Sequence, residues 1–159
     1  MMLTRALFIV VLSAILGTTG TGGTAKTEDA KKLQGTWKFV SVEGAEKAPP
    51  DGFKNIRMKI SADKLVVMAE GKEVNSQKYK INDAKNPREI DLVVKVLLDR
   101  GDVVVASDET RQGIYELKDD RLKICIALAT NKKTPTPAGR PTEFKTRGDL
   151  TIMVLEREK

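Results

Sequence analysis

The sequence predicts an all-β protein, an antiparallel meander of about eight strands preceded by one short helix. Apolar and polar residues alternate along most of the chain, so that one face of each strand is buried and the other is wet. Short runs of turn-forming residues separate these segments, and no long segment has the period of a helix. A closed barrel and a two-sheet β-sandwich both satisfy this pattern, and periodicity does not separate them.

The composition describes one folded domain without the usual catalytic groups. The chain has 159 residues, of which 40% are hydrophobic and 31% charged. It contains no histidine, which is the commonest general base and metal ligand, and its single cysteine, Cys125, cannot form an intramolecular disulfide. We therefore expect no enzyme activity, no catalytic residues, no metal site and no cofactor. The net charge of +6 comes from interleaved basic and acidic residues, which favours simple solubility; the alternative is an anionic partner such as a wall polymer, lipid head groups or nucleic acid.

The first 25 residues are typical of an export signal followed by a small-residue linker. Arg5 supplies a positive start, and residues 6–16 form an apolar run too short to span a bilayer comfortably. Small residues follow in 17–25, where a signal peptidase could cut. We expect residues 26–159 to form the single mature domain, exported to the periplasm or the outside of the cell. An uncleaved membrane anchor is the alternative.

The expected helix begins after Thr27, which can cap it, carries Glu28 and Asp29 in its first turn, and ends before Gly35. The strands follow in order, separated by turns at residues 61–63, 70–72, 83–87 and 119–120. The expected strand segments are 36–43, 56–60, 65–70, 78–81, 90–96, 113–118, 121–128 and 150–157. Residues 130–141 contain three prolines and are expected to form an exposed loop.

Five motifs, in order, resemble those of an uncharacterised lipocalin-like domain family found largely in planctomycete-type bacteria. They are LQGTWK at 33–38, NPREIDL at 86–92, GIYEL at 113–117, LKIC at 122–125 and RPTEF at 140–144. The resemblance covers about residues 31–158. It implies a lipocalin-like barrel and export, and it supplies no established activity and no catalytic residues.

The resemblance implies a structural role for Trp37, the only tryptophan, and for Gly35 two residues before it. In lipocalins a tryptophan at the start of the first strand closes the base of the barrel by packing with an arginine near the end of the chain. Arg157 and Arg140 are the available partners here, and a cation–π contact contributes about 0.5–2 kcal/mol.

Arg140, Glu143 and Phe144, which follow the proline-rich loop, are the candidate ligand-binding residues. Arg140 and Glu143 could line the mouth of a barrel and orient a ligand between apolar walls. Alternatively, an arginine–carboxylate pair fastens the loop to the barrel. The acidic residues around Arg100 and Gly101 (Asp99, Asp102, Asp108 and Glu109) match no EF-hand spacing, so a solvated turn is expected there. Glu89 and Asp91 are expected on one wet strand face.

These observations favour a non-enzymatic binding module that holds a small apolar molecule inside the barrel. The alternative is a cell-envelope interaction domain with a filled core, which acts through its surface or through the loop at 130–141. Neither hypothesis involves nucleic acid, because aromatic residues are only 4% of the chain. An enzyme that uses carboxylates alone is the third and least favoured hypothesis.

Overall fold

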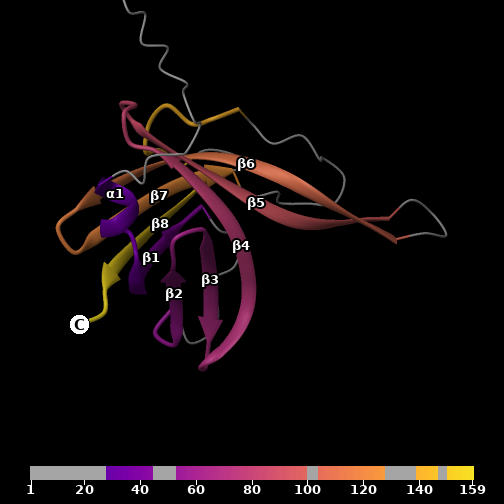
Figure 1. Cartoon of the computed structure of the whole chain (residues 1–159), viewed down its shortest axis with the longest axis horizontal. Coiled ribbons are helices and arrows are strands. Elements are labelled where there is room, and N and C mark those ends of the chain that lie inside the picture. Colours follow the sequence, from indigo (N-terminus) through magenta and orange to yellow (C-terminus); the bar gives the residue numbers. More distant parts are fainter. Residues whose placement is uncertain (1–27, 45–52, 100–103, 128–138, 147–149) are drawn as a thin grey trace, which may run out of the picture.

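The computed structural model describes residues 28–44, 53–99, 104–127, 139–146 and 150–159. It is a closed barrel in which every strand pairs antiparallel with the next and the last pairs with the first, as Figure 1 shows. The predicted meander is therefore confirmed, and the barrel rather than the sandwich is its architecture. The expected signal segment, Thr27 and residues 130–138 of the expected loop lie outside the described residues.

The elements follow one another along the chain as expected. They are α1 (Glu28–Lys32), β1 (Gly35–Glu43), β2 (Ile56–Ile60), β3 (Lys64–Ala69), β4 (Lys72–Asn82), β5 (Arg88–Asp99), β6 (Val104–Lys118), β7 (Arg121–Ala127) and β8 (Leu150–Arg157). Within the described part of the chain, no helix is long and apolar enough to cross a membrane.

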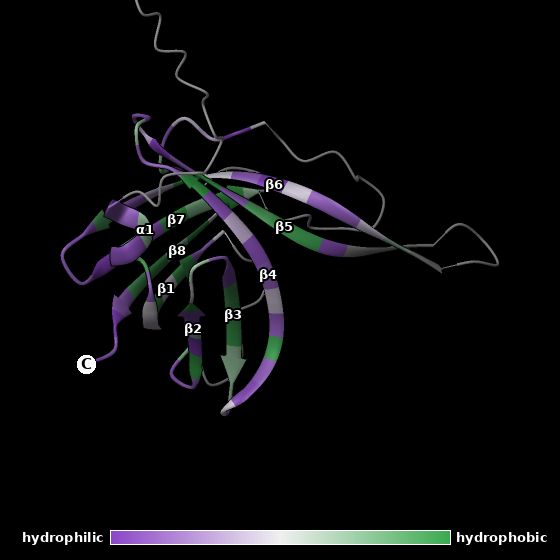
Figure 2. Ribbon diagram, in the orientation of Figure 1, coloured by the Kyte–Doolittle hydropathy of each residue, from purple (hydrophilic) through white to green (hydrophobic). Residues whose placement is uncertain are grey.

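Strands β4 and β6 are much longer than the sequence predicted. Their extra residues are mostly hydrophilic (Figure 2), so they lack the alternation that marks a half-buried strand. The expected turn around Arg100 was wrong for Asp108 and Glu109, because both lie on β6 and on opposite faces of it. No group of acidic, cysteine or histidine residues that could hold a metal ion occurs among the described residues.

Strands β5 and β6 form a ribbon that runs beyond the barrel wall (Figure 1). They pair with each other from Arg88 and Tyr115 to Asp99 and Val104, whereas β4 pairs with β5 only as far as Val93. The inward faces of all eight strands meet in the main core cluster. This cluster contains Leu33, Trp37, Met58, Ile60, Leu65, Tyr79, Ile90, Leu92, Val94, Tyr115, Leu122, Ile124, Ile126 and Leu155.

A second, smaller cluster covers the outer face of β6, β7 and β8. It contains Ile114, Cys125, Ala127, Leu150 and Ile152, and Phe144 packs against it from the segment that precedes β8. This part of the barrel wall is therefore apolar on both faces, which explains why residues 124–127 are continuously apolar in the sequence.

Candidate functional site

One end of the barrel is sealed by Trp37, Arg157 and the segment after helix α1. The Arg157 guanidinium lies 4.3 Å from the centroid of the Trp37 ring. Trp37 is fully buried, and its Nε1 donates a hydrogen bond of 2.8 Å to the carbonyl oxygen of Leu33. Arg157 donates from Nη1 to the carbonyl of Gln34 and from Nη2 to the carbonyl of Lys32. Arg157, and not Arg140, is thus the arginine that packs on Trp37.

Gly35 makes this packing possible. Its φ of +134° is one that side-chain-bearing residues rarely adopt, and a Cβ added there would lie 2.6 Å from Nη1 of Arg157. Gly35 does not end the helix directly, because α1 ends at Lys32 and Gly35 begins β1. The glycine is favoured by its φ of +134° and by the close approach of the guanidinium.

Helix α1 is held to the same end by a buried acid. Asp29 is only 6% exposed, and its Oδ2 accepts a hydrogen bond of 2.8 Å from the Tyr115 hydroxyl. The same oxygen lies 2.9 Å from Nη1 of Arg88. Burial and the Asp29 carboxylate raise the pKa of the Tyr115 hydroxyl far above its ordinary value. The helix therefore closes the barrel end through one hydrogen bond and one ion pair.

Arg140 lies on the outer face of strands β5 and β6. It donates to Oδ1 of Asp91 and to the carbonyl of Gly113, both at 2.7 Å, and lies 3.5 Å from Oε1 of Glu89. Glu89 and Asp91 share the outer face of β5, as their spacing predicted. Arg140 therefore makes the arginine–carboxylate contact that would fasten this segment to the barrel wall.

The other two candidate ligand-binding residues are elsewhere. Glu143 is exposed and pairs with Lys145 at 2.8 Å. Phe144 packs on the outer apolar cluster, 4.9 Å below Nζ of Lys123. Arg140, Glu143 and Phe144 thus do not converge on one site, and their contacts lie on the outside of the barrel wall.

Cys125 lies in that outer cluster and is fully buried. Burial raises the pKa of its thiol, and the nearby Lys123 only partly opposes this effect. A thiol with these surroundings is a weak nucleophile at neutral pH.

From Leu65 on β3 and from Tyr79 on β4, the barrel interior becomes more exposed in the direction away from helix α1. Along β3 the inward residues change from buried Leu65 to partly exposed Val67. Along β4 they change from buried Tyr79 through Gln77 to exposed Asn75, which pairs with Val67. On the side of β3 and β4, the half of the barrel remote from α1 is therefore the more open one. We call it the open half.

Apolar walls line part of the open half. Phe39, Val67 and Met153 are partly buried against the main core, and Phe39 stacks on Phe53 with the ring centroids 6.0 Å apart. Partly exposed apolar surface that faces inward is typical of ligand pockets.

Three polar side chains also face inward there. Gln77 pairs across the sheet with Leu65, Arg111 with Leu92, and Glu109 with Val94, and each of these partners lies in the main core. Residues paired across neighbouring strands share a face, so Gln77, Glu109 and Arg111 point into the barrel. We call these three residues the inner polar cluster.

The inner polar cluster is incompletely hydrogen-bonded. Nε of Arg111 lies 3.5 Å from Oε1 of Glu109, and neither this Nε nor Oε1 of Gln77 has a hydrogen-bond partner although both atoms are buried. An unpaired buried donor or acceptor costs about 1–3 kcal/mol. Gln77 and Arg111 gave no signal in the sequence, and Glu109 was expected in a solvated turn. The reason is that residues 107–112 of β6 are polar on both faces, so the sequence does not show which face is inside.

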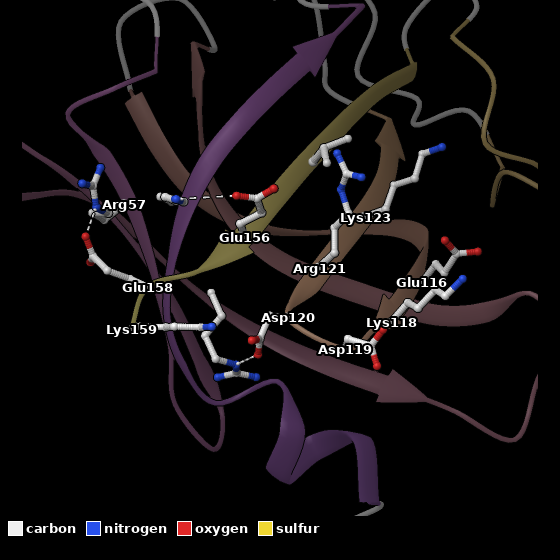
Figure 3. A pocket seen from close by; sticks show the side chains of 13 residues that line it. Arg57, Glu116, Lys118, Asp119, Asp120, Arg121, Lys123, Glu156, Glu158 and Lys159 are labelled. Carbon is white, nitrogen blue, oxygen red and sulfur yellow. Dashed lines mark hydrogen bonds and ion pairs between the residues drawn. The ribbon is translucent and has the colours of Figure 1, made fainter.

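A charged concavity of about 1120 Å³ lies on the outer face of β1, β2, β6, β7 and β8 (Figure 3). Seven basic and five acidic side chains line it. Several of them pair with one another: Arg57 with Glu158, Lys38 with Glu156 and Arg157 with Asp120. Lys118 and Arg121, on the hairpin between β6 and β7, have no ion pair within the described residues.

Comparison with known proteins adds no relative: no protein-family model, no curated protein and no solved structure matches this chain.

Proposed function

We propose that this protein is an exported binding module that holds a small, largely apolar molecule in the open half of its barrel. The observation that carries the proposal is the asymmetry of the interior. One end is sealed by Trp37 and Arg157, whereas toward the other end inward-facing apolar side chains remain partly exposed. Leaving Phe39, Val67 and Met153 partly in water sacrifices burial energy, which an apolar ligand would recover at about 25 cal/mol per Å².

Native mass spectrometry of the protein purified from its host, then exposed to a lipid extract, tests this proposal. We expect an adduct of constant small mass that is lost on denaturation. A bare polypeptide mass in both samples would contradict it. The polypeptide mass also tests export, since removal of a signal leaves a chain that lacks about the first 25 residues.

The outer concavity supports a second candidate, an interaction domain of the cell envelope that binds anionic polymers. Its basic side chains outnumber its acidic ones, and Lys118 and Arg121 are free of ion pairs within the described residues. Binding of polyphosphate that weakens as salt is added, and weakens further in Lys118→Ser and Arg121→Ser, is the expected result. Lys145→Ser, at an exposed basic residue that does not line the concavity, is the control. Equal binding by all three variants would dismiss this candidate.

A further inference from the structure

The inner polar cluster lies where the apolar core gives way to the open half. Cross-strand pairing places Glu109 beside Val94 and Arg111 beside Leu92. The strands that carry them, β6 and β5, pair without a break in register. Gln77 comes one residue before the pairing of β4 with β5, so it lies next to Val94 on the other side. The polar groups therefore border apolar side chains on the same inward face.

The burial of these residues differs sharply from that of their neighbours on β6. The side chains of Arg111 and Glu109 are 15% and 19% exposed. Thr110 and Gln112, which alternate with them on the outer face, are exposed. Groups that are this buried normally have their hydrogen-bonding atoms paired, and here a donor of Arg111 and an acceptor of Gln77 are not.

The charges of Arg111 and Glu109 limit which ligand groups can form the missing hydrogen bonds of the inner polar cluster. The carboxylate of Glu109 balances the guanidinium of Arg111 at 3.5 Å, so the pair is neutral overall. An anionic ligand group would be attracted by Arg111 but repelled by Glu109. A neutral group that accepts from Arg111 or donates to Oε1 of Gln77 supplies a missing hydrogen bond without adding a net charge.

We infer that the inner polar cluster binds the uncharged head group of an amphipathic ligand, a hydroxyl or primary amide that both accepts and donates a hydrogen bond. This inference rests on the proposed function, because the apolar body of the ligand would occupy the open half. Specificity then comes from the unpaired buried groups, because an analogue that cannot form hydrogen bonds with them binds more weakly.

Competition binding with matched short ligands tests the inference. The uncharged dye N-phenylnaphthylamine reports apolar occupancy, and octanol, methyl heptyl ether and octanoate compete for it. Octanol and the ether contain the same atoms, but only octanol has a proton to donate. We expect octanol to compete about five- to tenfold better than the ether, which corresponds to one hydrogen bond.

Two variants test whether the preference for octanol arises at the inner polar cluster. Gln77→Leu removes the acceptor, so octanol and the ether should compete equally while the dye still binds. Glu109→Gln removes the repulsive carboxylate at nearly constant shape, so octanoate should compete about tenfold better than with the unmodified protein. Gln112→Leu, on the exposed outer face of the same strand, is the control and should leave every ratio unchanged.

The outcomes separate the inference from the proposed function. No dye binding by the unmodified protein would overturn both. Dye binding with equal competition by octanol and the ether would overturn the inference alone, as expected if ordered water completes the cluster. If Gln77→Leu fails to fold, Glu109→Gln still tests the inference. An octanoate affinity equal to that of the unmodified protein would contradict the inference.

Discussion

Arg157, on the last strand, places its guanidinium over the ring of Trp37, on the first strand, 4.3 Å from the ring centroid. The two residues are also direct partners in the pairing of β1 with β8, the pairing that closes the barrel. The same guanidinium donates to the carbonyls of Lys32 and Gln34 at the end of helix α1. Arg157 therefore joins strand closure to the sealing of the barrel end.

Replacing Arg157 with leucine should destabilise the protein by about 2–4 kcal/mol. The substitution removes the cation–π contact and leaves the carbonyls of Lys32 and Gln34 without this donor. Urea unfolding monitored by Trp37 fluorescence measures the change. Lys38→Met, which removes a half-exposed lysine paired with Glu156 at 3.5 Å, should cost less than about 1 kcal/mol. Equal losses in the two variants would contradict the role given to Arg157.

Gly35→Ala should be more damaging than Gly71→Ala. Both glycines have positive φ, so both variants incur backbone strain, and the strain is larger at Gly35 because its φ of +134° lies farther from the left-handed region than the +77° of Gly71. Only at Gly35 does the new Cβ meet another group, Nη1 of Arg157 at 2.6 Å, whereas nothing lies within 4 Å at Gly71. We expect the loss in unfolding free energy to be at least about 1 kcal/mol larger for Gly35→Ala. Equal losses in the two variants would contradict both the larger strain at Gly35 and the close approach of Arg157.

The stability of the protein should fall as the pH rises above about 10, in part through Tyr115. Its pKa is raised in the folded state, by burial first and then by Asp29, so the unfolded chain releases this proton at a lower pH. Above that pH the unfolded state binds fewer protons, and the free energy of unfolding decreases. In Tyr115→Phe the free energy of unfolding, measured by chemical denaturation, should therefore decrease less steeply between about pH 10 and pH 11.

Tyr79, the only other tyrosine, contributes in the same direction because burial raises its pKa too. The double variant with Tyr79→Phe should flatten the profile further. At neutral pH, Tyr115→Phe should cost about 1–2 kcal/mol, since Asp29 loses one hydrogen bond. If Tyr115→Phe alone keeps the full decrease in unfolding free energy at alkaline pH, Tyr115 is not the group responsible.

Arg140 and Glu143 should respond very differently to truncation. Arg140→Ala removes contacts to Asp91 and to the carbonyl of Gly113, so we expect a loss of about 1–3 kcal/mol and faster proteolysis near residues 139–146. Glu143→Ala removes an exposed pair with Lys145 and should change stability by less than about 0.5 kcal/mol. If Arg140→Ala instead kept its stability and lost ligand adducts, a ligand-binding role for Arg140 would be favoured.

Several features of the fold could be read from the sequence because they depend on local alternation. Residues such as Ile56, Met58 and Ile60 show which side chains share a face, and turn residues show where strands end. The open half could not be read in the same way. Gln77, Glu109 and Arg111 are polar residues at inward positions, and they look like any solvated strand face until their cross-strand partners are known.

By itself, the sequence determined a meander of antiparallel strands with a short first helix, since period-two alternation and turn chemistry act over a few residues. Only the tertiary structure decided that β1 and β8 close a barrel and that Arg157 rather than Arg140 meets Trp37. It also decided that Arg140 lies on the outer wall and Arg111 on the inner one. The physical reason is that register between strands far apart in the chain depends on packing across the whole barrel, which no local pattern contains.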